Sequence, residues 1–137
     1  MITIAGYWDF SWSTPSEEMF YWEGVVREFD AKLIMSPVTG IRNRYVQEVH
    51  DLDEIIDNWV RDVVYVSESG STEISDFQHP EKALYVFGRS NYNPFNARAD
   101  KGGTSIKIAT SANTAMMLAP VAASIVMYDR FRKWHLQ

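Results

Sequence analysis

Short apolar runs alternate along this chain with longer segments in which apolar residues recur at helical spacing. Each run is bounded by polar or turn-forming residues, which is typical of buried strands. Strands separated by helices predict an α/β fold with a mostly parallel sheet flanked by helices. We expect strands at residues 2–7, 32–35, 62–66, 83–88 and 104–108, and a weaker one at residues 45–49.

The first helix carries strong local start signals. Thr14 is a suitable N-cap, Pro15 lies where a missing N–H costs nothing, and Glu17 completes a capping box. We expect this helix to end near Phe29 and a second helix to cover residues 52–60.

The last helix follows a loop of small residues. Proline is tolerated in the first turn of a helix and not further inside it, so Pro120 predicts that the helix begins near Met117 or Leu118. Residues 111–128 carry no charge, but they are rich in alanine and small polar residues. We therefore interpret this segment as a buried helix with a dimer or ligand face, and not as a membrane span.

The carboxyl ends of the strands indicate where a ligand would bind, because open parallel sheets bind ligands beyond these ends. One strand ends in Phe87-Gly88, and a glycine leaves bare main chain that a ligand can approach. The strand ending at Ile108 and the loop after it would complete a cradle of main-chain N–H and C=O groups. We expect a small-molecule site in the second half of the chain.

Composition narrows the class of protein. An apolar content of 46% over 137 residues favours one globular domain, residues 1–137. The chain has no cysteine and no secretion signal at its start, which favours a reducing, cytoplasmic location. The net charge of −5 argues against a large, permanently bound nucleic-acid surface, although Arg42 and Arg44 form a local basic pair.

Aromatic residues make up 14% of the chain, which favours a packed core or a dimer face. Phe20, Tyr21 and Trp22 lie in the first helix, and we expect them to form a homodimer face together with the apolar last helix. The histidines and carboxylates have no spacing typical of a metal site, so we expect no bound metal. Neither a Ser-His-Asp pattern nor a phosphate loop is present in the sequence.

The last third of the chain carries short motifs in a distinctive order. Phe87-Gly88 ends one strand, Ile108-Ala109 ends the next, and residues 124–132 (S-I-V-M-Y-D-R-F-R) end the last helix. This order resembles the SPOUT superfamily of RNA methyltransferases, and within it the branch of small proteins that methylate tRNA ribose 2′-hydroxyls. The resemblance is clearest over residues 63–134.

The resemblance implies a C-terminal trefoil knot, S-adenosyl-L-methionine as cofactor, tRNA or rRNA as substrate, and a homodimer. It implies no DNA or membrane partner. In this family the cofactor binds in a bent form to main-chain groups inside the knot. Carried over to this sequence, the main chains of Val66, Gly88, Ile108 and Met116 would contact the cofactor. Met116 and Met117 would pack around its adenine, although core packing explains both methionines equally well.

Several functional positions differ from the family's motifs. The Asn and Arg of N-x-G-x-x-x-R fall on Glu18 and Gly24, and the Glu of F-G-x-E falls on Ser90. The candidates for a cation that organises the acceptor RNA are then Arg27, Arg42, Arg44 and Arg89. Arg89 is our first candidate catalytic residue and Arg27 our second. Two functions stay open: an active RNA methyltransferase, and a catalytically degenerate, homodimeric binding protein that keeps the knot, with or without the ligand pocket.

Overall fold

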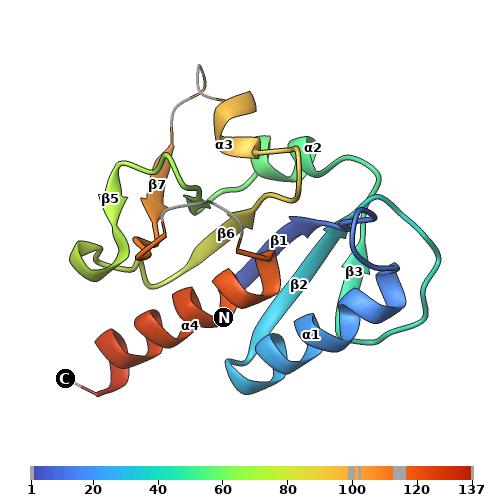
Figure 1. Ribbon diagram of the computed structural model, residues 1–137, viewed down its shortest axis with the longest axis horizontal. Coiled ribbons are helices and arrows are strands. Elements are labelled where there is room, and N and C mark those ends of the chain that lie inside the picture. Colours follow the sequence, from blue (N-terminus) through green and yellow to red (C-terminus); the bar gives the residue numbers. More distant parts are fainter. Residues whose placement is uncertain (1, 99–100, 102, 113–116, 137) are drawn as a thin grey trace.

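A computed structural model describes residues 2–98, 101, 103–112 and 117–136. Its centre is a seven-stranded sheet with the strand order β3-β2-β1-β6-β4-β7-β5, in which every neighbouring pair is parallel (Figure 1). This confirms the predicted α/β class with a parallel sheet flanked by helices. The strands are β1 Ile2–Tyr7, β2 Ala31–Ser36, β3 Val46–Glu48, β4 Asp62–Val66, β5 Thr72–Glu73, β6 Ala83–Phe87 and β7 Thr104–Lys107.

Helices cover both faces of this sheet (Figure 1). The two long helices, α1 Pro15–Glu28 and α4 Ala119–His135, lie side by side on one face. The short helices α2 Leu52–Asp57 and α3 Pro94–Ala97 lie on the other face, and a 3₁₀ turn, η1 Ile74–Asp76, precedes β6.

The helix starts agree with the local sequence rules. Both hydrogen bonds of the predicted capping box form between Thr14 and Glu17, and Leu118 is the N-cap of α4 with Pro120 just behind it. By contrast, α2 ends at Asp57 and is shorter than expected. The sequence reasoning missed α3 and β5, because elements of four and two residues are too short to produce a periodic apolar pattern.

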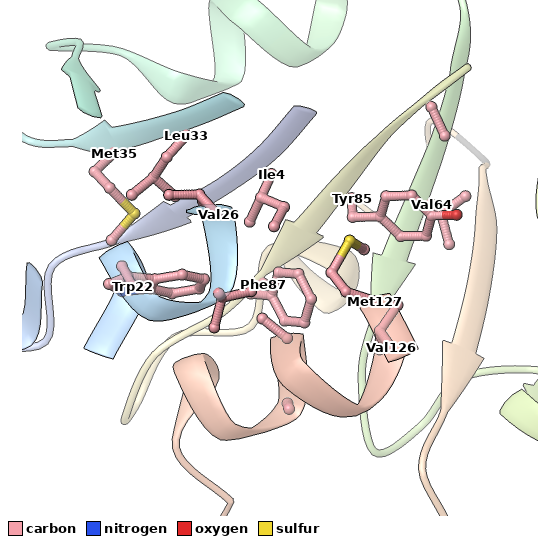
Figure 2. Close-up of a cluster of buried hydrophobic side chains, with 14 of the residues drawn as sticks. Ile4, Trp22, Val26, Leu33, Met35, Val64, Tyr85, Phe87, Val126 and Met127 are labelled. Atoms are coloured by element: carbon pink, nitrogen blue, oxygen red, sulfur yellow. The ribbon is translucent and has the colours of Figure 1, made fainter. Parts of the chain in front are cut away.

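The larger core cluster fills the space between the sheet and the two long helices (Figure 2). Trp22 of α1 is fully buried there and meets the ring of Phe87 edge-on, with the ring centroids 6.0 Å apart. Our prediction that Trp22 belongs to a dimer face was therefore wrong: its side chain points toward the sheet, while Phe20 and Tyr21 point to solvent. From α4, Val126 and Met127 complete this cluster.

Two predictions concern features beyond the sheet itself. No helix in the described ranges is long and apolar enough to cross a membrane. The chain between β7 and α4 includes residues 113–116, which lie outside the described residues. The trefoil knot therefore stays a prediction.

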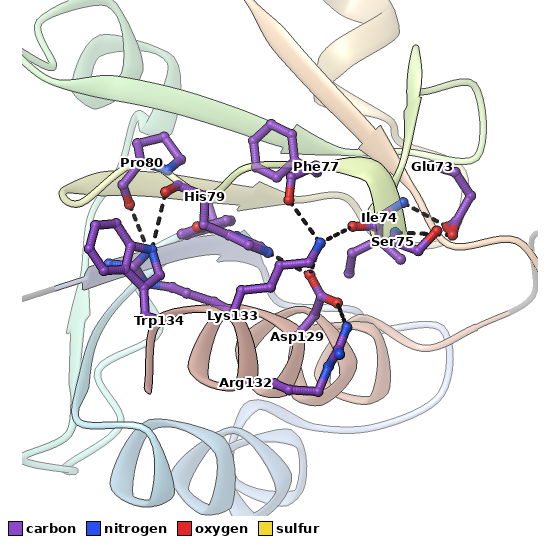
Figure 3. A network of polar contacts seen from close by, with 12 residues as sticks. Glu73, Ile74, Ser75, Phe77, His79, Pro80, Asp129, Arg132, Lys133 and Trp134 are labelled. Atoms are coloured by element: carbon purple, nitrogen blue, oxygen red, sulfur yellow. Dashed lines mark hydrogen bonds and ion pairs between the residues drawn. The ribbon is translucent and has the colours of Figure 1, made fainter. Parts of the chain in front are cut away.

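A buried polar network joins α4 to β6 and to the segment that precedes β6 (Figure 3). His79 lies in the connection before β6; its Nδ1 is 2.7 Å from the Tyr85 hydroxyl and its Nε2 is 2.7 Å from an Asp129 carboxylate oxygen. Lys133 lies 2.9 Å from the same carboxylate oxygen and donates hydrogen bonds to the main-chain carbonyls of Ile74 and Phe77. The carboxyl-terminal half of α4 is thus joined to the segment that leads into β6.

Burial lowers the pKa of His79, and the positive charges of Lys133 and Arg130 act in the same direction. These influences outweigh the Asp129 carboxylate, which Lys133 and Arg132 already neutralise in part. A neutral ring satisfies both contacts, because Nε2–H can donate to Asp129 while Nδ1 accepts the O–H of Tyr85.

We therefore expect folding stability to fall as the pH drops below 6.5, the ordinary pKa of histidine, because His79 then takes up a proton more readily in the unfolded chain. His79→Gln should cost about 1–3 kcal/mol at pH 7.5 and flatten the pH dependence. Urea unfolding between pH 7.5 and 5.5 measures both effects, and it stays well above the range in which Asp129 protonates.

The matched control is His50→Gln, since His50 is exposed at the surface. That variant should keep both the stability and the pH slope of the parent. A parent slope that survives unchanged in His79→Gln would contradict the assignment.

Candidate functional site

Three strand ends lie next to one another at the carboxyl edge of the sheet. Val66, the last residue of β4, pairs with Phe87 of β6 on one side and with Ile106 of β7 on the other. Gly88 and Ile108 follow directly at the ends of those two neighbours. Phe87 and Ile106 are buried, whereas Val66, Gly88 and Ile108 are all half-buried. The structure thus brings together three of the predicted cofactor-binding positions and leaves them accessible.

The two methionines of the predicted site can be followed only in part. Met117 lies at the end of the loop that leads into α4, directly before the N-cap Leu118, and is 37% exposed. Met116 lies outside the described residues. Met117 is therefore not a core residue, which removes the alternative of ordinary core packing for this one side chain.

Hydroxyl and amide side chains join the loops that follow β4 and β6. The Asn93 amide donates a hydrogen bond of 2.7 Å to the hydroxyl oxygen of Ser67, and the Ser69 hydroxyl donates one of 3.1 Å to the carbonyl oxygen of the Asn96 side chain. Asn93 also caps α3 through its side-chain oxygen. The edge of the site is therefore lined with neutral polar groups.

Gly88 is needed for a reason that the sequence reasoning did not supply. Arg89 and Tyr92 exchange two main-chain hydrogen bonds of 2.9 Å, which fold the chain back over Gly88 as a tight hairpin. A Cβ atom on Gly88 would come within 2.5 Å of the Tyr92 carbonyl oxygen. We expected a ligand to occupy the space beside the Gly88 Cα atom. That expectation was wrong, because the main chain at Tyr92 fills this space. The role of the Gly88 main chain in cofactor binding stays a prediction.

A buried carboxylate at the carboxyl end of β1 connects the hairpin to α1. One oxygen of Asp9 accepts hydrogen bonds from the main chain and the hydroxyl of Ser90, at 2.9 and 2.7 Å. The main-chain N–H of Asp9 donates to Glu18 at 2.7 Å, and Glu18 also accepts from the indole of Trp22 at 2.8 Å. Ser90 and Glu18 stand where the resembling family has Glu and Asn, so Asp9 joins the two altered positions.

The pKa values of the two carboxyl groups in this network are shifted in opposite directions. Burial acts to raise the pKa of Asp9, but hydrogen bonds from Ser11 and Ser90 outweigh it and hold that pKa below its usual value. For Glu18 burial dominates and raises the pKa. The sequence reasoning missed Asp9, since it treated residues 8–13 only as a loop. The available signal was an acidic residue two positions after a strand end.

The structure separates the two candidate catalytic arginines. Arg89 is exposed, follows Gly88 in the hairpin, and forms no ion pair within the described part of the chain. Arg27 lies in the last turn of α1, where it pairs with Glu23 at 3.2 Å. Because α1 runs from the carboxyl end of β1 to the amino end of β2, Arg27 lies toward the opposite edge of the sheet from Gly88 within one chain.

Comparison with solved structures identifies the fold. A structure from a study of the 2-OH methylation of C/U34 on tRNA superposes with a TM-score of 0.76 at 14% identity, covering 97% of this chain and 90% of that one. The SpoU methyltransferase AviRb from Streptomyces viridochromogenes, in complex with the cofactor AdoMet, superposes with a TM-score of 0.74 at 15% identity. That match covers 96% of this chain and 57% of AviRb.

The TrmH/SpoU tRNA modifying enzyme of A. aeolicus superposes with a TM-score of 0.74 at 10% identity, covering 96% of this chain and 74% of that one. This chain thus has the fold of the SPOUT RNA methyltransferases, as the resemblance implied. No model of a known protein family matches the sequence, and no curated protein matches it either.

The crowding around Gly88 gives a direct test. Gly88→Ala should destabilise the protein by about 1–3 kcal/mol, because the new methyl group would push the Tyr92 carbonyl and open the hairpin. The control is Gly24→Ala in α1, where a Cβ would meet nothing within 4 Å. That variant should be neutral or more stable by about 0.5–1 kcal/mol. Urea unfolding compares the two; equal stability of Gly88→Ala and the parent would argue against the packing described.

Proposed function

We propose that this protein is an S-adenosylmethionine-dependent RNA methyltransferase acting on tRNA or rRNA. The main support is the group of three accessible strand ends, at Val66, Gly88 and Ile108, in a chain with the fold of RNA methyltransferases. One of the similar structures carries AdoMet. Because tRNA and rRNA are present in the cytoplasm, we expect the enzyme to act there.

The groups at this edge suit the cofactor. Main-chain N–H and C=O groups at Val66, Gly88 and Ile108 would hold it, and the exposed Met117 would pack against its adenine. The hydrogen bond between Asn93 and Ser67 holds the loops after β4 and β6 in place beside these groups. When bound, S-adenosylmethionine supplies a methyl group that its sulfonium has already activated.

The acceptor RNA needs a cation that orients its phosphate or ribose. Arg89 remains the first candidate, because it is exposed and its hairpin is anchored to Asp9 through Ser90. A fixed guanidinium can align the acceptor oxygen without taking part in bond making. Arg27 is the second candidate. It lines a surface depression on α1 together with Phe20 and Gly24. In the dimer proposed below, Arg27 would contact the RNA from this position, next to the interface.

Calorimetry with S-adenosylmethionine and transfer of a labelled methyl group to bulk tRNA and rRNA test this function. Arg89→Ala should cut methyl transfer by roughly 100-fold or more and leave cofactor affinity nearly unchanged, as expected for a group that positions the substrate. Arg61→Ala, an exposed arginine before the amino end of β4, is the matched control and should retain activity.

The outcomes separate the two functions left open by the sequence. No binding of the cofactor or its demethylated product at millimolar concentration would overturn the enzyme assignment. Cofactor binding without transfer to either RNA would favour the catalytically degenerate binding protein. Methyl transfer that survives in Arg89→Ala and fails in Arg27→Ala would show that Arg27, and not Arg89, is the arginine needed for the reaction.

We also propose a homodimer built on the α1/α4 apolar face, which consists of Phe20, Tyr21, Val121, Ile125 and Tyr128. All five side chains are exposed, and Phe20 reaches 78%. Val121, Ile125 and Tyr128 recur at helical spacing along α4, and α4 lies beside α1 (Figure 1). Contiguous apolar surface on a small protein usually marks an interface, and twofold pairing is the commonest form.

Light scattering at micromolar concentration should report a dimer of the 15.8 kDa chain. Ile125→Glu should give a monomer, because the charge would lie in the middle of the apolar face. Val60→Glu is the matched control: Val60 is 90% exposed but lies away from this face, in the connection between α2 and β4. A parent that is monomeric at this concentration would contradict the proposal.

A further inference from the structure

A single carboxylate fixes the start of the loop between β2 and β3, residues 37–45. Glu48 accepts hydrogen bonds from the main chains of Thr39 and Gly40, at 3.0 and 2.8 Å, and from the indole N–H of Trp8 at 2.7 Å. Burial opposes ionisation here, but these bonds hold the pKa of Glu48 below its usual value. The negative charge of Glu48 is thus committed to fixing the start of the loop.

The end of the same loop is fixed against α1. The ring of Tyr45 lies between two guanidinium groups, with the central carbon of Arg44 4.9 Å and that of Arg27 5.3 Å from its centroid. Arg44 also donates a hydrogen bond of 2.8 Å to the Tyr45 hydroxyl. The side chain of Asn43 donates to Glu23 at 3.2 Å and accepts from the Tyr45 main chain at 2.8 Å. These contacts fix the backbone of the loop from which the side chains of Arg42 and Arg44 extend.

The two arginines of this loop are exposed at the surface. Arg42 and Arg44 are both exposed, and neither forms an ion pair among the residues that the structure describes. By contrast, the guanidinium of Arg98 contacts Asp53 and Asp57. In a chain with a net charge of −5, exposed arginines that lie on a fixed backbone and form no ion pair among the described residues suit an anionic ligand.

The position of the loop suits a long ligand better than a small one. It leaves the carboxyl end of β2 and sweeps around the outer side of the sheet beside β3 and α1 (Figure 1). The two surface depressions that we identify, on α1 and at the amino ends of β4 and β6, do not include Arg42 or Arg44, so the loop presents its charges on an open surface. β3 is three strands away from β6, a distance of about 14 Å at the usual strand spacing.

From these observations we infer that Arg42 and Arg44 bind the phosphate backbone of the RNA substrate, as a second contact region away from the proposed methyl-transfer site. This inference rests on the proposed function and assigns residues to its RNA contact. Guanidinium groups bind phosphate oxygens in pairs of hydrogen bonds, and such contacts position RNA without reading its sequence. This basic pair lies on the loop that precedes β3, three strands from β6, and would hold one part of an RNA while another part lies at Gly88.

Salt-dependent binding of bulk tRNA to the full chain, followed by fluorescence anisotropy, tests the inference. The double variant Arg42→Ala/Arg44→Ala should bind more weakly, and the slope of log affinity against log salt should decrease by roughly 1.5–2, the value for two lost phosphate contacts. Arg42→Ala alone should lower the slope by about half as much. The single variant leaves Arg44 and its contacts to Tyr45 intact, so it separates lost charge from a disturbed loop.

The control is Arg61→Ala/Lys82→Ala, which removes the same charge from exposed side chains at the amino ends of β4 and β6. Its slope should equal that of the parent, and both double variants should keep the parent's affinity for S-adenosylmethionine. Arg42→Lys/Arg44→Lys should restore most of the slope, because the charges return.

The failures are distinguishable. A parent that binds and methylates RNA while the Arg42/Arg44 double variant keeps its slope would overturn this inference and leave the proposed function intact. Equal loss of slope in both double variants would also overturn it, since the effect would then reflect net charge alone. A parent that does not bind tRNA at all would overturn the inference together with the RNA substrate.

Discussion

The parallel pairing of β6 with both β1 and β4 is the constraint on which the rest of the molecule depends. All five residues of β6 are buried, so this strand forms the centre of the fold. Each connection between parallel strands is a crossover that carries the chain back to the amino end of the sheet. Every strand therefore ends at the same, carboxyl edge. The loops after β1, β4, β6 and β7 therefore meet at one edge, although the residues that form them are spread along almost the whole chain.

Attachment of α4 divides that helix into two faces with different tasks. Its inner face contributes Val126 and Met127 to the core, and Asp129 to the network around His79. These contacts combine apolar burial with charge-assisted hydrogen bonds, which fix the rotation of the helix about its axis. The rotation in turn decides that Val121 and Ile125 point outward, where they form part of the α1/α4 apolar face.

The sequence was informative wherever the cause of a structure is local. Strand positions, the Thr14 cap and the start of α4 follow from neighbours along the chain, and they were predicted. The strand ends at Val66, Gly88 and Ile108 were predicted as well, because the carboxyl end of a strand can be located without knowing its partners. The direction of Trp22, the filling of the space at Gly88 and the bonds of Asp9 depend on contacts between distant segments, which no local pattern encodes.

The chain of contacts from Ser90 through Asp9 to Glu18 has a consequence for recognising such proteins by sequence. In this chain the carboxylate next to the Arg89–Tyr92 hairpin is that of Asp9, which follows β1. Ser90 donates hydrogen bonds to it from its main chain and its hydroxyl. A search that compares residues position by position records two losses at Ser90 and Glu18, although both still take part in one connected network. A Glu at position 90 would set a second carboxylate against Asp9, so the residues at positions 9 and 90 are coupled through their hydrogen bonds. We therefore expect residues 9, 18 and 90 to vary together in proteins that share this network, so that covariation among them would mark kinship where identity at any one position does not.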